Sequence, residues 1–349
     1  MCNQGRKPVL VTGATGYVGA RLVARLRSRG IPVRAAGRSK EKLLARPFSR
    51  DPAVELATCD VLDLSSLRGA CAGCSAVYYL VHSMDPGQHD FSHADREGAR
   101  NMARAAELEH VDRIIYLGGL GDPDAGISEH LRSRIEVGEI LAGGKVPVTT
   151  LRAAMVIGGG SGSYEILHYL VDRLPVMITP RWVGTESQPI AIRNVLDYLA
   201  GVLEVPATAG GTFDIGGPEV ITYRRLMDLY AEEAGLRKRW IIPVPVLSPR
   251  LSSYWIDLVT PAPASLARPL AEGLSSRLVC GDDRIRRLVP VELLDCRSAI
   301  RAAIPGRQPL PSEAGEAEGT GVPDEAKIIP GDPEWACRRE KPITRRGGR

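Results

Sequence analysis

The chain has 349 residues, of which 44% are hydrophobic and 25% are charged, as in a globular protein of one large or two smaller domains. Residues 338–349 hold six lysines and arginines but one glutamate. The rest of the chain is close to neutral, which argues against a basic surface for nucleic acid. No apolar run approaches the ~20 residues of a transmembrane helix. Since no signal peptide precedes the first apolar run, we expect a cytoplasmic location.

The chain has seven cysteines, an odd number, and they are scattered along the sequence. This is consistent with a reducing compartment. Cys71 and Cys74 have CxxC spacing, but neither a second ligand pair nor a helix N-terminus accompanies them. We therefore interpret them as small residues that close a helix rather than as a redox or zinc site.

The stretch from Val9 to Gly19 passes from a short apolar run into three glycines spaced GxxGxxG, and an amphipathic segment follows. This order predicts a strand, a tight turn and a helix. Glycines permit the turn and let a pyrophosphate approach the backbone, and the helix N-terminus offers N–H groups to the phosphates. We therefore predict a dinucleotide site here. Its residues are Gly13, Thr15, Gly16, Tyr17, Val18 and Gly19.

The second predicted strand, Ile31–Ala36, is followed by Arg38 and Lys40. In a dinucleotide-binding fold the end of this strand lies near the adenosine ribose, where an acidic residue binds the hydroxyls of NAD. The two cations suit a 2′-phosphate instead, so we expect NADP(H) to be preferred over NAD(H). The alternative is that Arg38 is a solvated arginine after a strand.

The third and fourth predicted strands are Val54–Thr58 and Ala76–Val81. Asp60 follows the third strand, where its carboxylate can accept from the adenine amino group. The fourth strand is a continuous apolar run and ends at the carboxyl edge of the sheet, where ligands bind. We therefore add five residues to the predicted cofactor site: Asp60, Val61, Leu80, Val81 and His82.

Three histidines follow one another closely, at positions 82, 89 and 93, before and within a predicted helix that runs to Glu109. His89 and His93 are four residues apart and can share a helix face. Because no third ligand with convincing spacing follows, we expect a solvated helix start and no metal.

Further strands are predicted at Arg113–Gly118 and Val146–Ile157, with a helix at Ser128–Leu141 between them. Strands and helices thus alternate six times in the first half of the chain. This pattern predicts an α/β fold, a Rossmann doubly wound parallel sheet, in residues 8–160.

The second half is more mixed and predicts a smaller C-terminal substrate subdomain, residues 161–304, interleaved with the Rossmann core. Its predicted elements are Tyr164–Arg173, Pro189–Ile192, Val195–Glu204, Thr212–Ile215 and Tyr223–Gly235. The proline-rich apolar stretch 240–274 would line a substrate pocket, contact a protein or membrane surface, or simply be core. Residues 305–349 are rich in Gly, Pro and Glu, and we expect a disordered tail.

Several motifs together resemble the short-chain dehydrogenase/reductase superfamily in its extended and atypical branches. They are Thr12–Gly19, Cys59–Asp63, Leu151–Ala154, Pro189–Ile192 and Phe213–Glu219. The segments Tyr79–Met84, His130–Arg134 and Pro180–Val183 resemble, more narrowly, bacterial NAD(P)-binding proteins related to nucleoside-diphosphate-sugar epimerases and to the NAD(P)H-binding-subunit-like proteins of complex I. In that group an extra domain often follows, and Gly331–Ala336 is similar to its start, which suggests a truncated domain.

The resemblance implies a catalytic Ser or Thr and a Tyr-x-x-x-Lys pair, in which the tyrosine moves a proton to or from a substrate oxygen. This chain departs from that pattern. The corresponding strand end, Gly118–Gly121, has no hydroxyl, and the tyrosine and lysine positions are occupied by His130 and Arg134. We predict His130 as a general acid with a pKa near neutrality, Arg134 as a group that holds the ribose or an anionic substrate, and His82 as a weaker catalytic candidate.

Three functions remain open from the sequence. The first is an NADPH-dependent oxidoreductase that reduces a small apolar, quinone-like or carbonyl substrate. The second is a non-catalytic NADP(H)-binding redox sensor or assembly factor of a protein complex. The third is a sugar-nucleotide epimerase or dehydratase, which needs a base that the sequence does not visibly supply.

Overall fold

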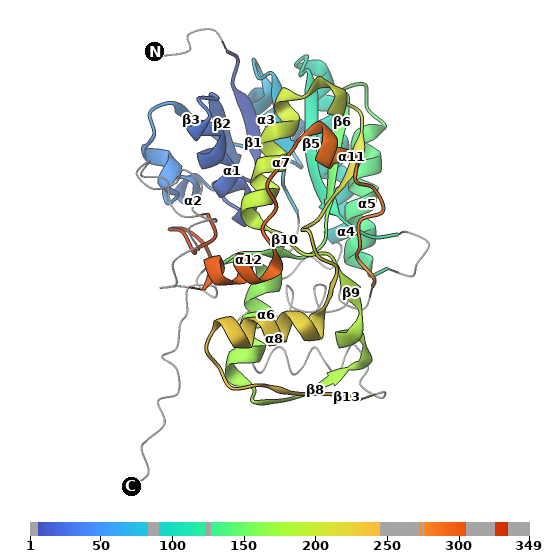
Figure 1. The fold of residues 1–349 in the computed structure, drawn as a ribbon. Coiled ribbons are helices and arrows are strands. Elements are labelled where there is room, and N and C mark those ends of the chain that lie inside the picture. Colours follow the sequence, from blue (N-terminus) through green and yellow to red (C-terminus); the bar gives the residue numbers. More distant parts are fainter. Residues whose placement is uncertain are drawn as a thin grey trace.

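The computed structural model describes residues 6–82, 91–122, 127–244, 273, 276–304 and 325–333. A seven-stranded parallel sheet in the order β11-β6-β5-β4-β1-β2-β3 forms the larger part of the molecule (Figure 1). This order, with the crossover at β1 and β4, is that of a Rossmann fold, which confirms the predicted class. The strands are β1 (Val9–Thr12), β2 (Val33–Gly37), β3 (Val54–Thr58), β4 (Ala76–Tyr79), β5 (Arg113–Gly119), β6 (Val148–Ala153) and β11 (Thr212–Ile215).

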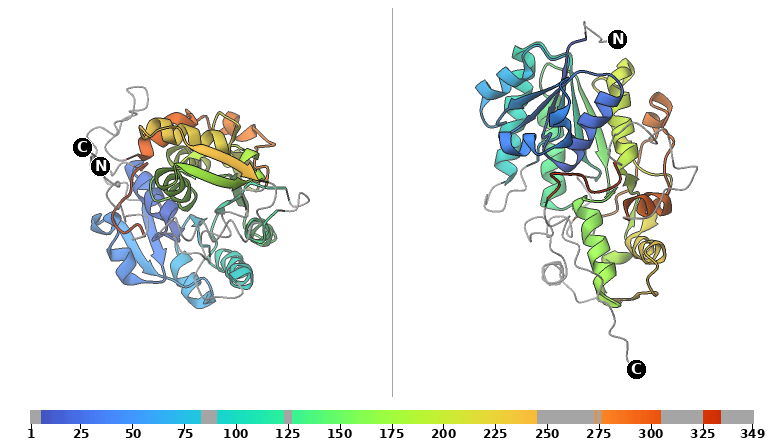
Figure 2. Two further views of the ribbon diagram at one scale, coloured as in Figure 1. Left: turned by 90° about the horizontal axis from the view of Figure 1, so that it is seen from below. Right: turned by 90° about the vertical axis from the view of Figure 1, so that its left-hand side faces the viewer.

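Helices cover both faces of this sheet (Figure 2). Because side chains alternate along a strand, Val9 and Tyr78 enter the core beneath α1 and α7, whereas Leu10 and Tyr79 enter the core beneath α3, α4 and α5. Continuous apolar strands such as β4 therefore follow from burial on both sides. The helices are α1 (Tyr17–Ser28), α2 (Lys40–Leu44), α3 (Leu64–Cys71), α4 (Phe91–Leu108), α5 (Glu129–Ala142) and α7 (Ile192–Glu204).

The predicted sixth strand, Val146–Ile157, is wrong as a single element. β6 ends at Ala153, and the chain leaves the sheet before the short strand β7 (Val156–Ile157). β7 pairs instead with β10 (Ile190–Ala191), and the N–H of Ile190 donates to the carbonyl of Met155. The mostly apolar sequence conceals this break because most residues on both sides of it are buried.

The smaller part of the molecule packs below the carboxyl edge of the sheet and around its own apolar core (Figure 1). Helix α7 begins at Ile192, earlier than predicted and directly after β10, and packs on the large sheet, so the two parts share chain segments. The other elements of the smaller part are α6 (Gly162–Arg173), β8 (Val176–Pro180), β9 (Glu186–Ser187), β12 (Ile221–Thr222), α8 (Tyr223–Glu233), β13 (Trp240–Val244) and α12 (Cys296–Ala303). Helix α11 (Arg284–Leu288) packs beside β11 of the large sheet (Figure 1).

Residues 325–333 lie beside α1 and α2, so the predicted disorder of the tail is wrong for this segment (Figure 1). The carboxylate of Asp332 accepts from the guanidinium groups of Arg21 and Arg46, each at 2.8 Å. Arg21 and Arg46 are 1% and 3% exposed, and buried charges require such partners. The rest of the predicted tail, and most of the apolar stretch 240–274, lie outside the described residues.

Candidate functional site

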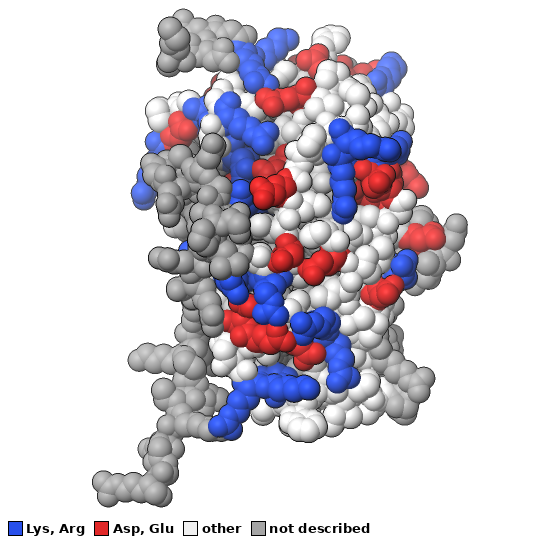
Figure 3. Space-filling model, viewed as in Figure 1, with Lys and Arg blue, Asp and Glu red and all other residues white. Residues whose placement is uncertain are grey.

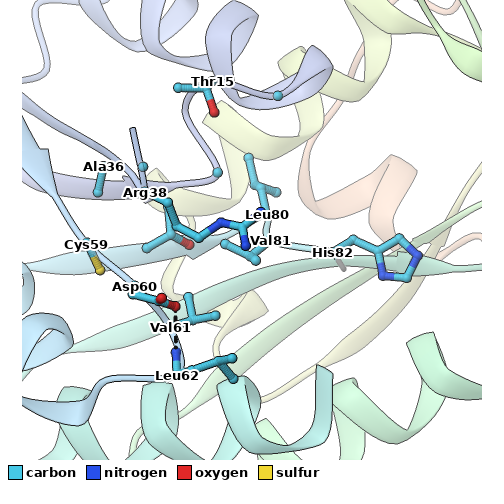
Figure 4. A pocket seen from close by; sticks show the side chains of 14 residues that line it. Thr15, Ala36, Arg38, Cys59, Asp60, Val61, Leu62, Leu80, Val81 and His82 are labelled. Atoms are coloured by element: carbon cyan, nitrogen blue, oxygen red, sulfur yellow. Dashed lines mark hydrogen bonds between the residues drawn. The ribbon is translucent and has the colours of Figure 1, made fainter. Parts of the chain in front are cut away.

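A pocket opens at the carboxyl ends of β1, β2, β3 and β4, where a doubly wound sheet binds its ligands (Figure 4). It extends from the glycine turn after β1 to His82, just after β4. Its lining residues are Thr12, Gly13, Thr15, Gly16, Ala36, Gly37, Arg38, Cys59, Asp60, Val61, Leu62, Leu80, Val81 and His82. Nine of the residues predicted from the sequence to bind a cofactor thus meet at one pocket.

The glycine turn has no room for side chains. Gly13 has a φ of +69°, and a Cβ on it would lie 2.6 Å from the carbonyl oxygen of Leu80. A Cβ on Gly19 would lie 2.2 Å from the carbonyl oxygen of Gly13. The helix α1 begins after Gly16, with no side-chain cap and no acidic residue in its first turn. Such an uncapped helix N-terminus fits the pyrophosphate of a dinucleotide.

The end of the pocket at β2 and β3 carries Arg38 and Asp60 on neighbouring loops (Figure 4). The carboxylate of Asp60 accepts from the backbone N–H of Leu62 at 3.0 Å, which fixes the turn after β3. Lys40 begins α2 and lies outside the pocket lining. Arg38 is therefore the cation that the fold brings to the pocket at the end of β2.

Three predicted cofactor residues, Tyr17, Val18 and Gly19, lie in α1 and outside the pocket lining. The side chain of Tyr17 turns away from the pocket toward Gly158, where a Cβ would lie 2.3 Å from its hydroxyl. The guanidinium of Arg21 stacks on the Tyr17 ring, 4.1 Å from the ring centroid. The structure therefore gives the Tyr17 side chain a packing role.

At the other end of the pocket, His82 belongs to a chain of hydrogen-bonded side chains. Its Nδ1 lies 2.9 Å from a carboxylate oxygen of Asp95, and its Nε2 lies 3.1 Å from Nδ1 of His130. The hydroxyl of Ser133 donates to the same Asp95 oxygen at 3.1 Å. Because a carboxylate only accepts, His82 donates through Nδ1 and accepts through Nε2, and His130 donates to it through Nδ1.

The prediction of a near-neutral pKa for His130 is wrong. Burial lowers its pKa to about 3, and the neighbouring His82 and Arg134 act in the same direction. Burial also lowers the pKa of His82, although Asp95 opposes this shift. Both rings are therefore neutral at neutral pH, in an environment that disfavours the imidazolium form.

Arg134 is engaged by the protein itself. Its guanidinium donates to the backbone carbonyl of Leu117 on β5 and lies over the ring of Tyr116, 5.9 Å from the centroid. The hydroxyl of Tyr116 in turn donates to the carbonyl of Arg134 at 2.9 Å. These contacts tie α5 to β5, and they give Arg134 a structural role beside the predicted one.

The sequence did not point to Asp95 or Ser133. Both lie inside helices, on α4 and α5, where a single polar residue gives no local signal. Asp95 is only 4% exposed, and burial becomes apparent only in the folded chain. Ser133 is three residues from His130, so the two share a face of α5.

The other candidate groups show no metal or redox chemistry among the described residues. No cluster of three potential metal ligands occurs in that part of the chain, and His89 lies outside it. Cys71 and Cys74 are buried at the end of α3, and burial raises the pKa of Cys71 to about 12. Such thiols are poor nucleophiles and poor metal ligands.

The sheet order, the glycine turn and the pocket together define a dinucleotide-binding protein of the Rossmann class. Residues 13–167 match a family model described as NAD(P)H-binding. This stretch of the chain is therefore similar to NAD(P)H-binding domains, and the sheet order around it is that of a Rossmann fold.

Two curated relatives illustrate this relationship. The chain is 35% identical to cinnamoyl-CoA reductase 1 of Oryza sativa subsp. japonica over 142 residues, which cover 36% of this chain and 41% of that protein. It is 24% identical over 252 residues to subunit 9 of the NADH dehydrogenase [ubiquinone] 1 alpha subcomplex of Arabidopsis thaliana, covering 68% and 60% of the two chains. The chain spans less than half the length of the curated relatives that are at least 30% identical to it.

Solved structures share the fold over most of the chain. A nucleoside-diphosphate-sugar epimerase from Staphylococcus aureus superposes with a TM-score of 0.68 and 18% identity, covering 84% of this chain and 99% of that one. An NADPH-dependent quinone oxidoreductase from Escherichia coli gives 0.66 and 19%, covering 84% and 98%. These likenesses concern the fold. Within the described residues, no helix is both long and apolar enough to cross a membrane.

Proposed function

We propose that this protein is an NADPH-dependent reductase of a small apolar substrate, such as a quinone or a conjugated carbonyl compound, in the cytoplasm. The observation that carries the proposal is the hydrogen-bonded chain Asp95–His82–His130, which begins where the dinucleotide pocket ends. By the resemblance of His130–Arg134 to the Tyr-x-x-x-Lys pattern, His130 would stand in place of the catalytic tyrosine, and the chain would offer imidazole nitrogens for proton transfer instead.

The cofactor would be held by the residues of the pocket. The uncapped N-terminus of α1 and the glycines before it would receive the pyrophosphate, and Asp60 would accept from the adenine amino group. Arg38 would pair with the 2′-phosphate of NADPH. With the adenosine beside Arg38 and Asp60, the nicotinamide would lie near His82 at the opposite end of the pocket. When bound, it supplies the hydride.

The proton chemistry follows from the two neutral histidines. Because burial lowers both of their pKa values, neither ring holds a spare proton at neutral pH. A substrate oxygen that gains negative charge beside His130 would raise the pKa of that ring and draw a proton to it. His82 and Asp95 would orient His130 and stabilise the protonated pair.

This weak proton supply favours substrates that need little acid assistance. A quinone or an enone accepts hydride at a carbon and spreads the negative charge over a conjugated oxygen. The fold-level neighbours include an NADPH-dependent quinone oxidoreductase, and the relatives at higher identity include a reductase. Both are consistent with the proposal.

A second candidate is a non-catalytic NADP(H)-binding sensor or assembly factor. The specific observation in its favour is that the guanidinium of Arg134, which the resemblance matches to the catalytic lysine, donates to the backbone carbonyl of Leu117. The relation to a complex I subunit fits this role as well. An epimerase is less favoured despite the shared fold. Its proton-shuttling base would have to be His130, whose pKa is lowered by burial.

The test begins with calorimetric titration of the purified protein with NADPH and NADH. Oxidation of NADPH is then followed by absorbance with a panel of small quinones and conjugated carbonyl compounds. Selective NADPH binding with turnover of a quinone supports the reductase. Tight binding with no turnover across the panel would reject it in favour of the sensor, and absence of binding would reject both.

A further inference from the structure

The strands β8 and β13 form a two-stranded parallel sheet at the end of the molecule away from the dinucleotide pocket (Figure 1). Alternate side chains face inward, and Met177 and Ile241 are 3% and 5% exposed in the core of the smaller part. The other face consists of four apolar residues that remain exposed. Their exposures are 52% for Val176, 62% for Ile178, 72% for Trp240 and 48% for Ile242.

These four residues form one contiguous surface, here called the β8–β13 face. The register pairs Trp240 with Val176 and Ile242 with Ile178, so the side chains stand in two adjacent cross-strand pairs. Scattered exposed apolar residues need no explanation, but a contiguous apolar patch usually marks an interaction site.

A basic rim borders the β8–β13 face. Arg237 and Lys238 are exposed just before Trp240, and the guanidinium of Arg239 is held by the carbonyl of Val171 at 2.8 Å. Segments 172–178 and 236–244 together contain four basic residues and one acidic residue, Asp172, a net charge of +3. Figure 3 shows uncharged atoms along the lower edge of the molecule, with lysine and arginine beside them.

We propose that the β8–β13 face docks on the surface of an anionic lipid bilayer. Tryptophan prefers the boundary between headgroups and acyl chains, and neighbouring lysines and arginines are attracted to anionic headgroups. The face consists of only four side chains, so it would enter the boundary between headgroups and acyl chains and would not span the bilayer. Such docking would bring the protein to membrane-dissolved apolar compounds, but it does not depend on the proposed enzymatic activity.

The charge of the rim decides between a bilayer and a second copy of this chain. A two-fold pairing of the β8–β13 face would bring two identical basic rims together, and like charges across an interface are unfavourable. An anionic membrane complements both the apolar face and its rim. Trp240 is the most exposed of the four side chains and is expected to contribute most to the contact with the bilayer.

The experiment is co-sedimentation of the full chain with vesicles of phosphatidylglycerol and phosphatidylcholine, compared with vesicles of phosphatidylcholine alone. We expect binding to the anionic vesicles that weakens as salt is added. Trp240 fluorescence is not specific, since the chain has 4 tryptophans, so sedimentation is the readout. Failure to sediment with anionic vesicles would overturn the proposal.

Two sets of variants measure separately how the apolar face and its basic rim contribute to vesicle binding. The double variant Trp240→Ser/Ile178→Ser should bind about tenfold more weakly, because two apolar side chains no longer enter the bilayer. Arg237→Gln and Lys238→Gln should each weaken binding to anionic vesicles by about fivefold. All these side chains are exposed, so circular dichroism should show an unchanged fold.

Val220→Ser is the matched control, because Val220 is an apolar residue with the same exposure as Ile242, 48%, away from β8 and β13. It should bind vesicles like the unchanged chain. Equal losses in this control and in the Trp240/Ile178 variant would contradict a specific face. Light scattering that shows a dimer abolished by Trp240→Ser would assign the face to a second copy and overturn the bilayer proposal.

Discussion

The Nε2 atom of His82 lies 3.1 Å from the Nδ1 atom of His130, and the two rings are tilted with centroids 4.8 Å apart. The pair joins the strand end at the dinucleotide pocket to the first turn of α5. With Asp95 behind His82, it provides the protein with one polar path from a buried carboxylate to the proposed reaction site.

Replacement of His130 by alanine should lower kcat by about 100-fold with any substrate that the unchanged protein reduces, because one proton-transfer group is lost. The affinity for NADPH should change little, since His130 lies outside the pocket lining. Steady-state kinetics and calorimetry measure the two effects. Unchanged turnover in this variant would remove His130 from the mechanism.

The buried histidines should make the fold sensitive to acid. Their folded-state pKa values lie below the ordinary value of 6.5, so the unfolded chain binds more protons as the pH falls below about 6.5. Each histidine then contributes a loss of at most about 1.4 kcal/mol per pH unit. In His130→Gln the free energy of unfolding should fall less steeply between neutral and acidic pH. Parallel curves for both proteins would contradict the lowered pKa.

Arg38→Ala should weaken NADPH binding by about 1–3 kcal/mol, because a charge-assisted contact to the 2′-phosphate is lost. NADH binding should change much less. Lys40→Ala is the control, since Lys40 lies outside the pocket lining. Calorimetric titrations with both dinucleotides give the comparison, and equal losses for NADPH and NADH would contradict the assignment of Arg38.

Gly19→Ala should disrupt the glycine turn, because its Cβ would lie 2.2 Å from the carbonyl oxygen of Gly13. Overpacking of this kind costs about 1–3 kcal/mol of unfolding free energy, and NADPH binding should fall with it. Gly69→Ala, in α3 with open space around it, is the matched control and should leave binding intact. Denaturant unfolding and titration report the two effects separately.

Asp332→Asn should destabilise the fold by about 3–5 kcal/mol, because two buried guanidinium groups lose their shared carboxylate. The control is Glu325→Gln in the same segment, whose partner Arg25 is 20% exposed and also pairs with Asp197. It should cost less than about 1 kcal/mol. Similar urea midpoints for both variants would show that residues 325–333 do not contribute to stability.

Much of the fold was predictable because it depends on local patterns. The strands Val54–Thr58 and Thr212–Ile215 have the bounds that were predicted from the sequence. The break between β6 and β7 was not predictable, because it depends on pairing with β10, more than thirty residues later. Residues 325–333 looked disordered by composition, yet Asp332 binds an arginine that is 311 residues earlier in the chain.

The candidate site divides in the same way. The glycine turn and the residues after β2, β3 and β4 follow from the order of strands, and most of them meet at the pocket. The pKa of His130 could not be foreseen, because it depends on burial and on the proximity of His82. Asp95 was missed because helix α4 gives no sequence signal for which of its polar residues faces inward.

The shared sheet has a consequence for any attempt to divide this chain. A fragment that stops near residue 160 would contain β6 but would lack its neighbour β11, together with α7, whose Leu199 carbonyl accepts from the hydroxyl of Tyr78. The inner strand Val148–Ala153 would become an open, apolar edge with unpaired backbone groups, the kind of edge that recruits other chains. Shortened versions should therefore aggregate rather than fold, because the two halves of the chain complete one sheet.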